Sequence, residues 1–100
     1  MTKSLLIRRL SDPKTRRALR QFRIVHLALI GSYARAEERE ESDVDLLYES
    51  TNTGTRIPFE LMKAKLFLEG MLKKEVDLVS KTALRSDIRP FVEQDIVPLF

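Results

Sequence analysis

Three short runs of apolar and β-branched residues, set apart by polar and helix-forming segments, constrain the fold of this 100-residue chain most strongly. They are IVHLALI at residues 24–30, DVDLLYE at 43–49 and EVDLVS at 75–80. Runs of this length and composition predict strands. The first is typical of a strand buried on both faces, and Gly31 ends it.

Helical segments are expected around these strands. Ser11-Asp12-Pro13 is a helix-start signal and predicts a helix over about 12–21. The segment SYARAEERE after Gly31 can form a short helix, and residues 50–56 have the composition of a loop. Pro58 opens a segment with amphipathic helical spacing to about residue 73. Its expected apolar positions are Phe59, Met62, Leu66, Met71 and Leu72.

The C-terminal tail predicts a short helix broken near Pro90, and a hydrophobic end at 96–100 that docks on the core. Together the segments predict an α/β (α+β) fold in which helices flank one small mixed β-sheet. The length is that of one domain, residues 1–100.

Composition narrows the class of protein. No apolar run approaches the length of a membrane span. The chain has no cysteine, which excludes disulfides and thiolate metal sites, and a cytoplasmic protein is expected. Residues 1–23 hold eight Lys and Arg against one Asp, which suits an acidic partner or simply a solvated helix face. Aromatic residues are not interleaved there, so direct nucleic-acid binding is not expected.

Asp43 and Asp45 are the residues that an ordinary core strand does not explain. Side chains two apart in a strand point to the same face. Two carboxylates about 6 Å apart repel by about 3 kcal/mol at an effective dielectric of about 20. A bound Mg²⁺ turns this repulsion into a net attraction, because the ion prefers one or two carboxylates together with phosphate oxygens. The alternative is a hydrated strand start with weak repulsion.

Asp77 repeats the pattern in the third apolar run. If the second and third strands are neighbours, Asp77 joins Asp43 and Asp45 around one metal site for phosphoryl transfer. The alternative for Asp77 alone is an ion pair with Lys73 or Lys74.

Gly31-Ser32 offers the other half of such a site. Glycine at a strand end allows a tight turn into a helix, whose free N–H groups attract phosphate. The Ser32 hydroxyl adds a donor. The alternative is an ordinary strand-to-helix turn capped by Ser32.

GSYAR followed by SDVDLLYE, and then KKEVDLVS with the tail to residue 100, resembles the minimal nucleotidyltransferases of the DNA polymerase β superfamily. The resemblance implies transfer of a nucleoside monophosphate from an NTP to a hydroxyl. Gly31 and Ser32 would hold the triphosphate, with Arg35 able to reach phosphate. Asp43 and Asp45 would bind Mg²⁺, and Asp77 would complete the metal site and help deprotonate the acceptor.

A core this small resembles the antitoxin half of HEPN/MNT toxin–antitoxin pairs. That resemblance implies transfer of AMP from ATP to a tyrosine of a HEPN ribonuclease toxin, with homo- or hetero-oligomers possible in such a small core. The alternatives are transfer to a small-molecule hydroxyl, as in aminoglycoside modification, and a non-catalytic antitoxin that masks its toxin.

One position departs from the family pattern: Ala36 stands where glycine is common. Alanine is costly there if φ is positive and harmless if the residue is helical.

Overall fold

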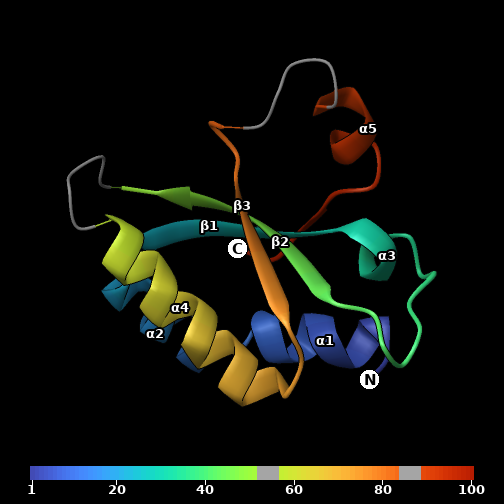
Figure 1. The fold of residues 1–100 in the computed structure, drawn as a ribbon, viewed down its shortest axis with the longest axis horizontal. Helices are drawn as coiled ribbons and strands as arrows, with labels where there is room; N and C mark the ends of the chain where they lie inside the picture. The colour runs from blue at the N-terminus through green and yellow to red at the C-terminus, as the bar shows by residue number, and fades with distance from the viewer. Residues whose placement is uncertain (52–56, 84–88) are drawn as a thin grey trace.

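The computed structural model describes residues 1–51, 57–83 and 89–100, so residues 52–56 of the expected loop and residues 84–88 of the C-terminal tail lie outside the described residues (Figure 1). Its centre is one four-stranded sheet in the order β3-β2-β1-β4. The strands are β1 (Ile24–Ile30), β2 (Val44–Ser50), β3 (Val76–Ser80) and β4 (Val97–Pro98). β1 is antiparallel to β2 and β4, whereas β2 and β3 are parallel. The predicted mixed sheet is confirmed, and the second and third strands are neighbours, which is the condition for Asp77 to join the site.

Helices cover one face of this sheet. They are α1 (Lys3–Leu10), α2 (Pro13–Gln21) and α4 (Ile57–Leu72), which lie together on one side of the strands in Figure 1. α3 (Gly31–Ala34) directly follows β1, and α5 (Arg89–Glu93) lies in the C-terminal tail. None of the helices in the described part of the chain is long and apolar enough to cross a membrane.

The first two helices begin at side-chain caps. The Asp12 carboxylate accepts the N–H of Lys14 at 2.8 Å, and Pro13 occupies the first turn, as the sequence predicted. The Thr2 hydroxyl accepts the N–H of Leu5 at 3.2 Å and begins α1. α1 was not expected from the sequence. It is short, and packing of Leu6 and Leu10 into the core stabilises it.

The hydrophobic core lies between the sheet and these helices. Along β2, Val44, Leu46 and Tyr48 alternate toward the helices and are buried. They pack with buried residues of the other elements: Leu6, Leu10, Leu19, Ile24, Leu27, Leu29, Ala64, Leu68, Leu72 and Val76. Full burial of one such leucine stabilises the fold by about 1.5–3 kcal/mol.

In the part of the chain that the structure describes, the opposite face of the sheet has no helix layer like that of α1, α2 and α4. His26 on β1 is exposed, so the prediction that the first strand is buried on both faces is wrong.

The C-terminal run docks as predicted: Leu99 donates its N–H to the carbonyl of Leu27 at 2.9 Å, and Phe100 packs against the core. The two-residue pairing of β4 with β1 extends the sheet by one short strand.

α4 has nearly the predicted bounds, but only two of its five predicted apolar positions face the core. Leu72 is buried and Met71 packs against the core, whereas Phe59, Met62 and Leu66 are 68%, 62% and 62% exposed. Ala64 and Leu68 take the remaining core positions. The helix is apolar on two opposite sides, and the sequence alone did not show which side meets the sheet.

Candidate active site

A hollow of about 390 Å³ lies where β1 ends and β2 and β3 begin. The residues that line it come from β1, the α3 turn, β2, β3 and the C-terminal tail: Ile30, Gly31, Arg35, Asp45, Asp77, Val79, Val92 and Asp95. Four of the six residues predicted for the site therefore lie around one cavity.

Asp45 and Asp77 form the centre of this hollow. They are register partners on the parallel strands β2 and β3. Because Val44 and Leu46 face the helices, the intervening Asp45 projects from the other face of the sheet. Asp43 is exposed and lies just before β2 begins. Within the described ranges, no three acidic or histidine side chains already converge into a ready-made metal site.

The electrostatics single out Asp45. Burial raises the pKa of its carboxyl above the ordinary value of 3.8, and the charges of Asp77 and then Asp43 raise it further. The charge of Arg35 acts in the opposite direction, as the weakest of these influences. Asp45 is thus a half-buried acid close to two others, which is costly for folding alone and typical of functional sites.

Gly31 is the position at which the backbone approaches these acids. Its φ is +75°, a conformation that glycine adopts without steric cost. A Cβ added at Gly31 would also collide with the Asp45 carboxylate. The positive φ and the close approach of Asp45 therefore each require glycine at this position. Only the first could be expected from the sequence.

Ser32 follows in the single turn of α3. It is half-buried, and its hydroxyl has no hydrogen-bond partner within residues 1–51, 57–83 and 89–100. The hydroxyl and the first N–H groups of the turn are therefore available to an anion, as the phosphate-cradle prediction requires. Ser32 itself does not line the hollow, and its role as a ligand stays a prediction.

The expected helix over SYARAEERE is wrong beyond Ala34. Ala36 has φ +57° and ends the helix. Its N–H bonds the Tyr33 carbonyl at 3.2 Å, and the N–H of Glu37 bonds the Ser32 carbonyl at 2.9 Å. This pair of bonds is a Schellman motif, whose left-handed position favours glycine. The question raised by Ala36 is thus answered: it occupies the left-handed position that disfavours alanine.

Two lysines hold the segment between α3 and β2. Lys74 donates to the carbonyl of Glu40, and its ammonium lies 5.9 Å from the ring centre of Tyr33. Lys3 donates to the carbonyl of Ala34 at 2.9 Å. Lys74 is therefore engaged with this loop, and no ion pair joins it to Asp77 among the described residues.

Arg35 borders the hollow and is exposed. Arg35 forms an ion pair with Glu37 at 3.3 Å, while Glu38 accepts the N–H of Lys3. A pair this exposed contributes little to stability. The guanidinium can therefore turn toward an anion at low cost.

Asp95 was missed by the sequence reasoning. It lies between α5 and β4 and lines the hollow beside Asp45 and Asp77. An acid in an irregular tail carries no periodic signal. Only the return of the tail along β1 brings it to the site.

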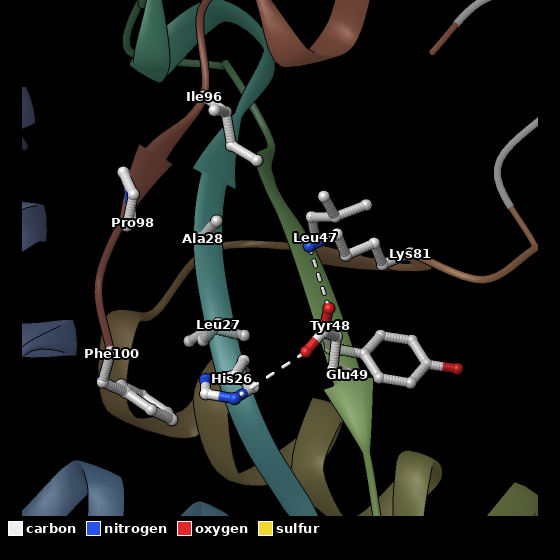
Figure 2. Close-up of a pocket in the computed structure, with 10 residues that line it drawn as sticks. All are labelled: His26, Leu27, Ala28, Leu47, Tyr48, Glu49, Lys81, Ile96, Pro98 and Phe100. Atoms are coloured by element: carbon white, nitrogen blue, oxygen red, sulfur yellow. Dashed lines mark ion pairs between the residues drawn. The ribbon is translucent and has the colours of Figure 1, made fainter.

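A second hollow of about 270 Å³ lies on the same face of the sheet, farther along the strands (Figure 2). Glu49 on β2 is paired with Lys81 at 2.9 Å and with His26 at 3.8 Å. Lys81 lowers the pKa of Glu49. The His26 side chain is 62% exposed, so this histidine is neither a core residue nor part of the hollow around Asp45.

The donor set around Asp45 fits a divalent cation. Carboxylate oxygens are the ligands that Mg²⁺ prefers. Asp45 and Asp77 lie opposite each other in register, and Asp43 is close enough to raise the pKa of Asp45. No ion pair within the described residues neutralises any of the three. Asp45 and Asp77, which the register places together, are the residues that would hold the cation, and the part of Asp43 stays a prediction.

The chain is similar to known proteins in sequence. The family profile of the nucleotidyltransferase domain matches residues 13–98. The protein adenylyltransferase MntA of Thermococcus cleftensis is 34% identical over 77 residues, which are 77% of this chain and 76% of that protein.

Solved structures agree on the fold. One, provisionally assigned as a minimal nucleotidyltransferase, superposes with a TM-score of 0.75 at 32% identity and covers 98% of this chain and 96% of that one. Another holds a tri-AMPylated HEPN toxin of Shewanella oneidensis in complex with an MNT antitoxin. Its TM-score is 0.62 at 20% identity, with 92% of this chain and 71% of that chain covered, and it supports the fold alone.

Proposed function

This chain belongs to the nucleotidyltransferase domain family, and from that premise we propose that it transfers AMP from ATP to a tyrosine hydroxyl of a HEPN ribonuclease toxin. The register of Asp45 opposite Asp77, beside a glycine that lets the backbone approach them, carries the proposal. The names of its relatives support a protein as acceptor: one is a protein adenylyltransferase, and a structural neighbour contains an AMPylated toxin.

The chain's residues divide the work of such a transfer. The α3 turn with Ser32 binds the triphosphate, and Arg35 adds positive charge at the rim of the hollow. Asp43, Asp45 and Asp77 would hold Mg²⁺, which would neutralise charge at the phosphate oxygens and on the leaving pyrophosphate. Gly31 keeps the backbone close to the nucleotide.

Asp77 has a second role in the proposal. The acceptor oxygen forms a bond to the α-phosphorus, and the bond from that phosphorus to the bridging oxygen of the β-phosphate breaks. Pyrophosphate leaves, and the proton of the acceptor hydroxyl passes to the Asp77 carboxylate. Asp77 is exposed, so an acceptor from another chain can reach it.

Transfer of AMP neutralises the toxin in this account. A bulky anion beside an RNA-cleaving site blocks RNA by steric exclusion and by repulsion of its phosphates. Because ATP is the substrate, the reaction takes place in the cytoplasm.

The test is incubation of the purified chain with α-labelled ATP, Mg²⁺ and a candidate HEPN-domain partner protein. We expect label on the partner with the unaltered chain and none above background with Asp43→Asn or Asp45→Asn. Glu75→Gln is the matched control, because Glu75 is exposed just before β3 and borders none of the hollows described above. Chelation by EDTA should stop transfer, and added Mg²⁺ should restore it.

The alternatives give different outcomes in the same experiment. If both Asp variants still neutralise the toxin and no label transfers, the chain acts by masking. If label appears on an aminoglycoside-like small molecule and never on the partner, the acceptor assignment is wrong.

A further inference from the structure

α4 carries an exposed apolar stripe that the fold does not use. Phe59, Met62 and Leu66 are each more than 60% exposed and recur at spacings of three and four, which places them on one side of the helix. The core residues Ala64 and Leu68 lie on the opposite side. We call Phe59, Met62 and Leu66 the α4 ridge. Contiguous exposed apolar residues of this size commonly mark an interaction surface.

A groove of about 490 Å³ runs between the ridge and β3. Met62 and Leu66 form its outer wall, and Leu78 of β3 forms part of the inner one. α4 and β3 lie side by side along this boundary in Figure 1. The groove thus has a strand as one wall, and its apolar lining of Leu61, Met62, Leu66 and Leu78 is interrupted by the charged Lys65, Glu69 and Asp77.

β3 is the edge strand of the sheet. Glu75 and Lys81 bond β2 through their backbones, so by alternation the N–H and C=O of Leu78 point to the open edge. The backbone N–H of Val76 also points to the open edge, and the Glu69 carboxylate accepts a hydrogen bond from it at 3.1 Å. The Leu78 groups have no backbone partner within the described residues, and an extended segment in the groove would pair with them.

Asp77 connects this groove to the active site, because it lines both hollows. A segment bound along β3 would thus pass beside the carboxylate that receives the acceptor proton in the proposed function. The groove and the ridge lie on the side of the site away from Gly31 and the phosphate cradle, where an acceptor has room.

The charges around the ridge indicate what kind of segment fits. Lys63 and Lys65 are exposed beside it, whereas Glu69 is engaged with the backbone of Val76. A second copy of this chain would set these lysines against their own counterparts. A partner with acidic residues flanking apolar ones would complement them.

We propose that the α4 ridge and the groove beside β3 bind an extended, acidic-flanked apolar segment of the acceptor protein and bring its hydroxyl to Asp77. This inference rests on the proposed function for the identity of the acceptor. Its docking step requires neither ATP nor catalysis.

The experiment measures affinity without nucleotide, by calorimetric titration of the full chain carrying Asp45→Asn into the HEPN-domain protein. Adding Leu66→Asp should weaken binding about tenfold or more, because an apolar anchor is lost and a carboxylate faces acidic flanks. Ser4→Asp is the matched control, with the same charge change at an exposed position of α1, and should bind unchanged. Thermal melts show that each variant is folded.

A second variant tests the charge argument. Lys63→Glu with Lys65→Glu leaves the ridge intact and should also weaken binding about tenfold, and more so at low salt. Unchanged affinity in Leu66→Asp, or no binding by the parent chain, overturns the proposal. So does sedimentation showing a dimer of this chain that Leu66→Asp dissociates.

The two proposals fail separately. If docking depends on Leu66 but no label ever transfers, the surface is correct and the chemistry is wrong. If label transfers equally with and without Leu66→Asp, the chemistry is correct and the surface is wrong.

Discussion

Ala36 shows how one side chain can oppose the local fold. It holds φ +57° at the left-handed position of the motif that ends α3. We predict that Ala36→Gly stabilises the protein by about 1 kcal/mol, because glycine removes the steric cost of that conformation. For a domain of this size the melting midpoint should rise by about 4–8 °C. Ala34→Gly, inside the α3 turn, should lower it; a fall with Ala36→Gly would contradict the assignment.

Asp45 is predicted to destabilise the metal-free fold at neutral pH. Its pKa is raised in the folded state, first by burial and then by Asp77 and Asp43. An acid of this kind contributes stability when protonated, below its ordinary pKa of 3.8, and loses that contribution as pH rises through the folded pKa. Asp45→Asn should therefore melt higher than the unaltered chain at pH 7 without metal, and the gap should close toward pH 3.

The control for this comparison is Mg²⁺. A cation held by the acids should raise the melting midpoint of the unaltered chain and leave that of Asp45→Asn nearly unchanged. Equal midpoints for the two proteins at pH 7 without metal would contradict the electrostatic description of Asp45.

At this scale the sequence predicted some residues and not others. Gly31, Asp45 and Asp77 stood out because each breaks the pattern of an apolar strand, and all three line one hollow. The sequence raised the φ of Ala36 as a question but left it open, and the local turn decides it. The position of Asp95 depends on how distant segments meet, so no local pattern could reveal it.

At the scale of elements, replacing either of the two described glycines by alanine is predicted to change stability in opposite directions. Gly70 lies within α4, and an added Cβ would meet nothing within 4 Å. Gly70→Ala should stabilise the protein by about 1 kcal/mol, because alanine favours a helix. Gly31→Ala should lower both the melting midpoint and AMP transfer, because it collides with Asp45 and requires positive φ.

Calorimetry of the two variants checks this pair. A destabilising Gly70→Ala would mean that the surface of α4 near Gly70 is not free, and a fully active Gly31→Ala would mean that the backbone does not approach Asp45.

The bounds of α4 were predictable from its composition, but its buried face was not. Both sides are apolar, and only packing against the sheet selects Ala64 and Leu68.

At the scale of the whole molecule, the mixed sheet with flanking helices followed from the order of apolar runs. Two features did not. β4 is two residues long and exists only because the tail returns beside β1. The open face of the sheet was hidden because IVHLALI has the composition of a doubly buried strand. The hollow around Asp45 and the hollow around Glu49 both lie on that face, so the exposure of the functional surface was not predictable although its acids were.

The central claim is that Asp45 and Asp77 act as one unit. The direct measurement is the rate of AMP transfer to the partner for Asp45→Asn, Asp77→Asn and the double variant, under single-turnover conditions. Each single change should reduce the rate at least about a thousandfold, and the double variant should lose little more, because residues of one catalytic unit are not additive. Losses that multiply in the double variant, or a single change that leaves the rate within about tenfold of the unaltered chain, would contradict the account.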